Sequence, residues 1–125
     1  AAQLDATGIS MQLKNKRGKS TDKTSKTKTV QVNFTIAKNV TAQNGHKTFY
    51  VRITTPSGTT LGGGGSFNYQ NRTLEATMKK TVEYDGQETS ISTFWNVSQS
   101  LLEGTYHVSI FADGNMIGSR SFTFK

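Results

Sequence analysis

Apolar and polar residues alternate along much of the chain with a period of two, the spacing that puts successive side chains on opposite faces of a β-strand. The alternation is clearest at residues 30–36, where four apolar side chains share one face, and it returns at residues 49–53. Shorter runs at residues 9–13 and 67–69 follow the same pattern. The best helix candidate, residues 97–103, covers about two turns at most. The pattern therefore predicts an all-β protein.

Two Asp-Gly pairs are expected to form the tight turns of β-hairpins. Asp85–Gly86 and Asp113–Gly114 each lie between two strand-like runs. Both central residues of a type I′ turn need positive φ, which these residue types tolerate. We therefore expect the strands around each pair to be hydrogen-bonded neighbours, beginning with Tyr84 opposite Gln87 in the first hairpin.

The second hairpin cannot keep one register along its whole length. With Ala112 opposite Asn115, an unbroken ladder would set Tyr106 opposite a serine and turn Phe122 away from the core. One extra residue restores the pairing of Tyr106 with Phe122. We therefore predict a β-bulge at Gly118–Ser119, where glycine readily takes the unusual dihedral angles.

A short motif near the C-terminus suggests a fold family. Residues 102–108 read Leu-Glu-Gly-Thr-Tyr-His-Val. This segment resembles the Leu-x-Gly-x-Tyr-x-Val pattern at the tyrosine corner of immunoglobulin-like sandwiches, where a buried tyrosine hydroxyl bonds to backbone just upstream. The resemblance implies an immunoglobulin-like sandwich of seven to eight antiparallel strands. The expected core consists of inward-facing residues of these strands: Val32, Phe34, Ile36, Phe49, Val51, Ile53, Val82, Ile91, Trp95, Tyr106, Val108, Ile110 and Phe122.

The C-terminal two-thirds also resembles a bacterial group of sandwich domains that often follow a coiled coil, in proteins loosely labelled as chromosome-segregation or cell-division related. The segments that carry this resemblance are Tyr50-Val-Arg-Ile53, Thr55-Pro-Ser-Gly58, Val82-Glu-Tyr84, Gly104-Thr-Tyr106, Ile110-Phe-Ala-Asp-Gly114 and Ile117-Gly118. The resemblance implies a non-catalytic structural or protein-interaction module of a larger bacterial protein. It favours the cell envelope over the cytoplasm.

Length and composition fit one small domain without covalent cross-links. The chain has 125 residues, and it contains no cysteine, which excludes disulfides and thiolate metal sites. Folding at this size buries about two-thirds of the surface, enough for an independent core. We expect residues 1–7 to be a lead-in or linker and residues 8–125 to form the domain. No apolar run is long enough to suggest a transmembrane segment.

The positive charge is concentrated in one segment. The net charge is +7 (15 basic and 8 acidic residues), and residues 14–28 carry +6 of it, with seven basic residues and a single acid, Asp22. The seven are Lys14, Lys16, Arg17, Lys19, Lys23, Lys26 and Lys28. Residues 15–29 contain no apolar side chain, so we expect a long mobile loop, and residues 14–29 are called the basic loop below.

The basic loop has two possible interpretations. It is either a solvated connection between strands or an arm that binds an anionic polymer such as nucleic acid or an acidic polysaccharide. The run is not interleaved with aromatic and amide side chains of the kind that read bases, so nucleic-acid binding would be non-specific. With about five phosphate contacts, the slope of log K against log salt would be near −4 to −5.

Three aromatic residues are predicted to face away from the core. Tyr50, Phe94 and Phe111 alternate with the core residues Val51, Trp95 and Ile110. If the three rings meet on one sheet, they form a protein-docking patch or a platform for carbohydrate. If they lie apart, they carry no functional meaning.

Catalytic signals are weak. The histidines, His46 and His107, lie far apart in the sequence and match no metal-ligand or triad spacing. The four glycines at residues 62–65 lack the following Lys-Ser/Thr of a phosphate-binding loop and are interpreted as a flexible connection. We therefore predict no catalytic residue, cofactor or metal, and a non-enzymatic function.

Overall fold

The computed structural model describes residues 3–125, and these residues form strands in three antiparallel sheets with one short 3-10 helix. The strands are β1 (Ala6–Lys14), β2 (Ser20–Thr21), β3 (Thr29–Ile36), β4 (Gly45–Thr54), β5 (Ser66–Tyr69), β6 (Arg72–Glu75), β7 (Met78–Tyr84), β8 (Thr89–Asn96), β9 (Gly104–Ala112) and β10 (Asn115–Phe124). The helix η1 spans Thr24–Lys26. The all-β prediction is confirmed.

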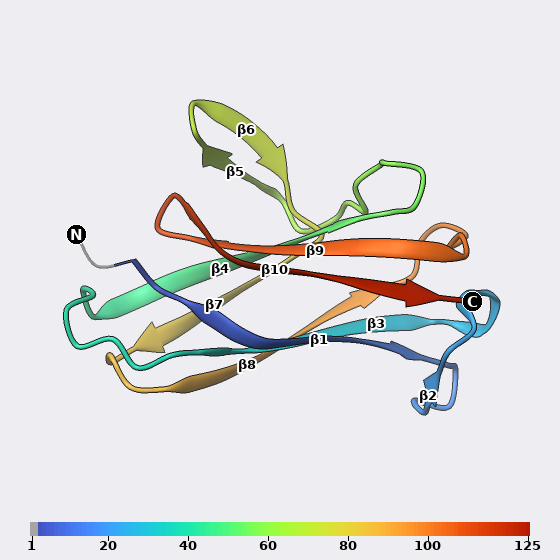
Figure 1. The fold of residues 1–125 in the computed structure, drawn as a ribbon, viewed down its shortest axis with the longest axis horizontal. Helices are drawn as coiled ribbons and strands as arrows, with labels where there is room; N and C mark the ends of the chain where they lie inside the picture. Colours follow the sequence, from blue (N-terminus) through green and yellow to red (C-terminus); the bar gives the residue numbers. More distant parts are fainter. Residues whose placement is uncertain (1–2) are drawn as a thin grey trace.

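Two four-stranded sheets form the two layers of the domain (Figure 1). Their strand orders are β2-β1-β3-β8, called sheet A, and β10-β9-β4-β7, called sheet B. The hairpin β5–β6 forms a separate two-stranded sheet that projects beyond sheet B (Figure 1). The expected seven to eight strands omitted β2 and β6, since both are short and neither has a clear apolar alternation.

The core lies between sheets A and B, where the period-two pattern places it. Every apolar position of β3 is buried and every polar position is half-buried. Each residue of the expected core is buried except Val82 and Phe122, which are half-buried. The rings of Phe34 and Phe49 join the two sheets edge to face, with centroids 6.0 Å apart.

The prediction of a hairpin at Asp85–Gly86 is wrong. Strand β7 pairs with β4, and β8 pairs with β3, so Asp85–Gly86 carries the chain from sheet B to sheet A. The physical reason is the partner that β8 gains. Its ladder with β3 runs over eight residue pairs and sets Ile91 opposite Phe34, whereas a local hairpin would match its apolar face mainly with small or polar residues of β7.

The second predicted hairpin is confirmed, with the bulge one residue earlier than expected. Asp113 and Gly114 both have positive φ, at 53° and 78°, and Phe122 lies opposite Tyr106. The register shifts between Met116 and Gly118, so the predicted bulge at Gly118–Ser119 lies instead at Ile117. The bulge turns the side chain of Ile117 into the core, where it is 4% exposed.

Residues 3–7, the described part of the expected lead-in, belong to the folded domain. Leu4 is buried, β1 begins at Ala6, and the Ala37 amide donates a hydrogen bond to the Asp5 carbonyl at 3.0 Å. Strand β1 also closes one side of the two layers against β10, because Arg120 Nη1 donates to the Ile9 carbonyl at 2.9 Å. The opposite side, between the edge strands β7 and β8, stays more open.

The tyrosine corner expected from the sequence is present. Tyr106 is 1% exposed, and its hydroxyl donates a hydrogen bond to the Leu102 carbonyl at 2.6 Å. Burial raises the pKa of Tyr106 above its ordinary value of 10.0. The hydrogen bond fixes the entry of the chain into β9, as the motif at residues 102–108 implied.

Replacing Tyr106 with phenylalanine is expected to lower the free energy of unfolding by about 1–2 kcal/mol at neutral pH, because the Leu102 carbonyl loses its donor. A raised pKa in the folded state gives stability that is full below pH 10.0 and is lost as the pH rises above it. Urea unfolding at pH 7 and above pH 10 checks both effects. The variant should lose less stability than the wild type on going to the higher pH; equal losses would contradict the assignment.

Candidate functional site

The basic loop contains regular structure, the strand β2 and the helix η1. Strand β2 pairs with the end of β1, setting Lys14 opposite Ser20. The Thr24 amide donates to the Lys125 carbonyl at 2.7 Å, and Thr24 and Thr27 are buried. The expected irregular loop thus contains a short strand and a helix turn, because buried threonines and backbone hydrogen bonds to Lys125 replace the missing apolar contacts.

The two arms of the basic loop are hydrogen-bonded to each other. The amide of Lys28 donates to the carbonyl of Lys14 at 2.8 Å. At the tip, Asn15 Oδ1 accepts from the amides of Arg17 and Lys19, at 2.9 and 3.1 Å. These bonds bring residues 15–17 beside residues 26–28, although eight residues, 18–25, lie between the two segments in the chain.

The result is a hollow of about 360 Å³ lined by five residues, here called the cationic hollow. The five are Asn15, Lys16, Arg17, Lys26 and Lys28. The four basic side chains are exposed. The remaining predicted cations of the loop lie outside the hollow: Lys14 is half-buried and donates to Ser20 Oγ at 3.3 Å, and Lys19 and Lys23 are exposed.

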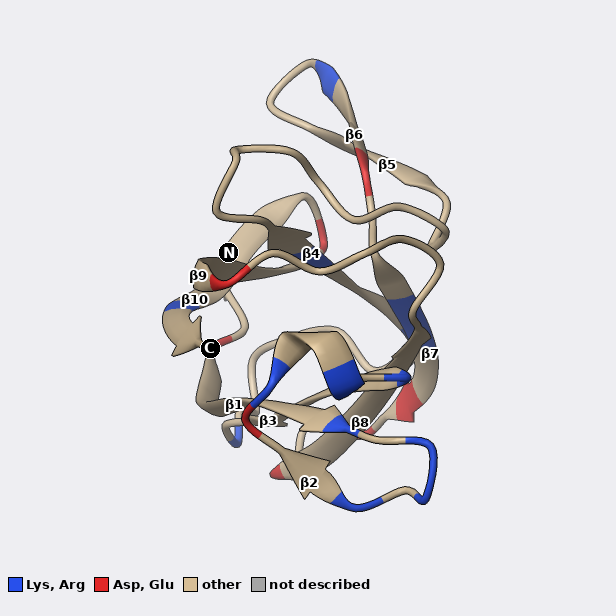
Figure 2. Cartoon of the chain, turned by 90° about the vertical axis from the view of Figure 1, so that its right-hand side faces the viewer, with Lys and Arg blue, Asp and Glu red and all other residues tan. Residues whose placement is uncertain are grey.

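No carboxylate neutralises these cations in the described part of the chain. Ion pairs within 4.0 Å join His46 with Glu83 and Lys47 with Asp113, both outside the basic loop. Figure 2 shows Lys and Arg gathered around β2 and the turns next to it, at one end of the two sheets. Unpaired like charges at this spacing produce a local positive potential that attracts anions.

The structure does not bring the three predicted surface aromatics together. Tyr50 and Phe111 lie side by side on the outer face of sheet B, where their backbones are paired. Phe94 lies on sheet A and is 59% exposed. The common platform that a shared aromatic surface requires is therefore not formed.

The hairpin β5–β6 covers the two aromatics of sheet B. Phe67 stacks on Tyr50 with centroids 4.7 Å apart, and it also contacts Phe111 at 4.8 Å. Tyr69 meets Phe111 edge to face at 5.0 Å. Phe111 is consequently buried, at 3% exposure. The sequence pattern located the run at residues 67–69. It missed the cover because the aromatic partners of this run, on β4 and β9, lie far from it in the chain.

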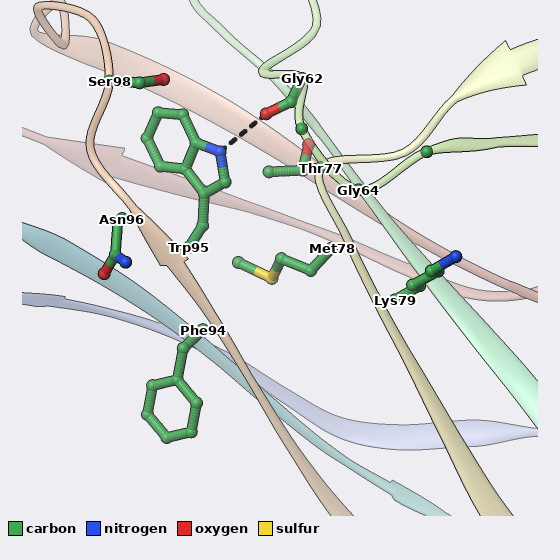
Figure 3. A pocket seen from close by; sticks show the side chains of 11 residues that line it. Gly62, Gly64, Thr77, Met78, Lys79, Phe94, Trp95, Asn96 and Ser98 are labelled. Carbon is green, nitrogen blue, oxygen red and sulfur yellow. Dashed lines mark hydrogen bonds between the residues drawn. The ribbon is translucent and has the colours of Figure 1, made fainter.

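A second hollow, of about 600 Å³, lies between β7, β8 and the four glycines (Figure 3). Trp95 Nε1 donates to the Gly62 carbonyl at 2.8 Å and fixes the glycine segment against β8. The segment is also bound to the residues just before β7, since the Gly64 amide donates to the Ala76 carbonyl at 2.9 Å. The connection is closely packed and hydrogen-bonded, which the sequence did not predict. Phe94 and Lys79 line the rim of this hollow.

The histidines lie apart in space as well as in sequence. His46 Nδ1 is 3.1 Å from Glu83, and His107 Nδ1 is 2.6 Å from Ser121 Oγ. Over residues 3–125, no three His, Cys, Asp or Glu side chains lie close enough together to hold a metal ion. The same residues contain no helix that is both long and apolar enough to cross a membrane.

The fold and site thus define an all-β domain of antiparallel sheets with a structured basic loop at one end. Residues 4–125 match the model of a family described as a domain of unknown function, DUF8428, and the chain belongs to that family. A search among curated proteins found no match.

One solved structure with a similar fold is that of Pseudomonas fluorescens alkylpurine DNA glycosylase AlkC, bound to DNA containing an abasic site analog. The TM-score is 0.52 and the sequence identity 10%. The similarity covers 98% of this chain but only 30% of that chain. At this identity the likeness concerns the fold alone.

Proposed function

We propose that this domain is a non-catalytic binding module whose basic loop holds an anionic polymer through its repeated phosphate or sulfate groups. The observation that carries the proposal is the convergence of Lys16, Arg17, Lys26 and Lys28 around one hollow without a carboxylate partner. Each cation that meets a phosphate releases condensed counterions, which is the main source of affinity in non-specific binding to nucleic acid.

The fold assignment that goes with this proposal is an immunoglobulin-like sandwich. Its support is the strand order of the two sheets, β1-β3-β8 facing β10-β9-β4-β7, together with the tyrosine corner at Tyr106. In such folds function is carried by loops at the ends of the sandwich. The basic loop occupies such a position.

Nucleic acid is the first polymer to test. The structurally similar glycosylase was solved on DNA, and a group of unpaired cations suits a backbone of repeated phosphates. An acidic polysaccharide carries negative charges at similarly regular intervals, so heparin serves as the second probe.

A protein-interaction module at the end of a larger bacterial protein is the second candidate function. It is favoured by the exposed Phe94 beside the open edge between β7 and β8.

Removing two cations from the hollow should weaken polymer binding about 10- to 100-fold at low salt, because two phosphate contacts and their counterion release are lost. The variant is K16Q/R17Q. Fluorescence anisotropy with labelled duplex DNA, and separately with labelled heparin, measures the change.

The matched control is K38Q/R72Q, which lowers the net charge by the same two units, from +7 to +5. Both residues are exposed and lie outside the basic loop. The control should change affinity less than about threefold, as a general charge effect. Equal losses in the two variants would remove the hollow as the site. No binding of either polymer by the wild type would favour the protein-interaction module.

A further inference from the structure

The outer face of sheet A is a polar surface that continues directly from the basic loop. Its outward residues lie in register across β1, β3 and β8. One row contains Gln12, Gln31 and Phe94, and the next row toward the basic loop contains Lys14, Thr29 and Asn96. We call these two rows, with Ser10, Asn33 and Ser92 behind them, the polar face.

Phe94 is the exception on this face. It is 59% exposed and is the one aromatic residue among the large exposed hydrophobic side chains of the described chain. Its ring lies on the side of β8 opposite to the buried Trp95 (Figure 3). An aromatic ring exposed on the edge strand of an otherwise polar sheet offers a flat surface on which a planar ligand can stack.

The polar face and the cationic hollow are joined through the backbone. The Val97 amide donates to the Lys28 carbonyl at 2.9 Å, and Thr29 lies opposite Asn96. Phe94 is therefore offset from Lys28 by three residues along the strands and one strand across. At about 3.4 Å per residue and 4.8 Å per strand, their Cα atoms are about 11 Å apart.

Hydrogen-bonding side chains lie on the strand next to the exposed ring. Gln31 Nε2 donates to Asn33 Oδ1 at 2.9 Å, which orients both amides on the surface beside Phe94. Asn96 is exposed two residues further along β8, and Gln12 is exposed in the row of Phe94 but two strands away, on β1. Amide side chains can both donate to and accept from the edges of a nucleobase.

We propose that the polar face and the basic loop together bind single-stranded nucleic acid, with one base stacked on Phe94 and neighbouring phosphates at the cationic hollow. This inference rests on the proposed function and adds its substrate class. A duplex keeps its bases stacked inside, so that Phe94 cannot reach a base face, whereas the unpaired bases of a single strand are free to turn onto the ring. Heparin has no bases.

The test compares four labelled probes with the wild-type domain: a 15-nucleotide oligothymidylate, the corresponding oligouridylate, a duplex of the same length and heparin. The single strands should bind more tightly than the duplex at the same salt. Replacing Phe94 with alanine should weaken single-strand binding about 5- to 150-fold, the worth of one stacked base. The same substitution should leave duplex and heparin binding unchanged. Comparing the affinities for oligothymidylate and oligouridylate shows whether the domain prefers single-stranded DNA or RNA.

Two further variants separate stacking from a structural effect. Phe94→Tyr keeps an aromatic face and should retain most single-strand affinity, whereas Met116→Ala removes another exposed apolar side chain, on β10, and should change nothing. If duplex and heparin bind and K16Q/R17Q weakens them, but F94A leaves single-strand binding unchanged, the stacking inference is overturned while the proposed function stands. If no probe binds, both fail.

Discussion

Replacing Gly64 with alanine is expected to destabilise the domain by about 3 kcal/mol, because the new methyl group meets backbone that cannot move. A Cβ at this position would lie 2.6 Å from the Met78 amide nitrogen and 2.7 Å from the Thr77 carbonyl carbon. Both neighbours are fixed, since the Thr77 amide donates to the Val51 carbonyl and the Gly64 amide to the Ala76 carbonyl.

The control lies two residues away. The three atoms nearest to a Cβ on Gly62 would all belong to the carboxylate of Glu75, the closest at 2.7 Å, and that exposed side chain can turn away. Gly62→Ala should therefore cost less than about 1 kcal/mol. Urea denaturation of both variants gives the comparison. Equal stability of the two variants would show that the glycine segment does not pack closely against β7.

Replacing Thr77 with valine is expected to cost about 3 kcal/mol although the side chain keeps its shape. Thr77 is 2% exposed, and its hydroxyl bonds two backbone groups at once. It accepts from the Ile53 amide at 2.9 Å and donates to the Leu61 carbonyl. Valine would leave a buried donor and a buried acceptor without partners, each worth about 1–3 kcal/mol.

Thr93→Val is the matched control for this prediction. Thr93 is equally buried, but its hydroxyl makes a single bond, donating to the Val32 carbonyl at 3.0 Å. Its replacement should cost about 1 kcal/mol. Thermal and urea unfolding of the two variants measure the difference, and a Thr77→Val variant no less stable than Thr93→Val would refute the bridging role of Thr77.

The strands were predictable where local sequence decides them. Alternation located β3 and β4, and the Asp113–Gly114 turn with the Tyr106–Phe122 pair fixed the last hairpin to within one residue of the bulge. These features depend on side chains close together in the sequence, and the burial of one face enforces them.

The pairing of β7 was not predictable in the same way. The Asp85–Gly86 turn indicates a local hairpin, yet β8 lies against β3, about 60 residues earlier in the chain. The partner of β8 depends on which strand, however distant in the sequence, offers the better match for its apolar side chains. The residues of a turn do not indicate whether β7 or β3 becomes the partner of β8.

The candidate site was also predictable only in part. The sequence located all seven cations of the basic loop, but the grouping of Lys16 and Arg17 with Lys26 and Lys28 depends on the bond between Lys28 and Lys14. The run itself contains no aromatic residue. Phe94 and Gln31 come beside it only through the register of β3 and β8. Pairing between strands that are distant in the sequence thus brings Phe94 and Gln31 close to the basic loop.

The most direct test of the account is the salt dependence of oligothymidylate binding by the wild-type domain. With four to five phosphates held by the basic loop, the slope of log K against log salt should be about −3 for a single strand. A slope near zero, with binding intact, would contradict the electrostatic role of the basic loop.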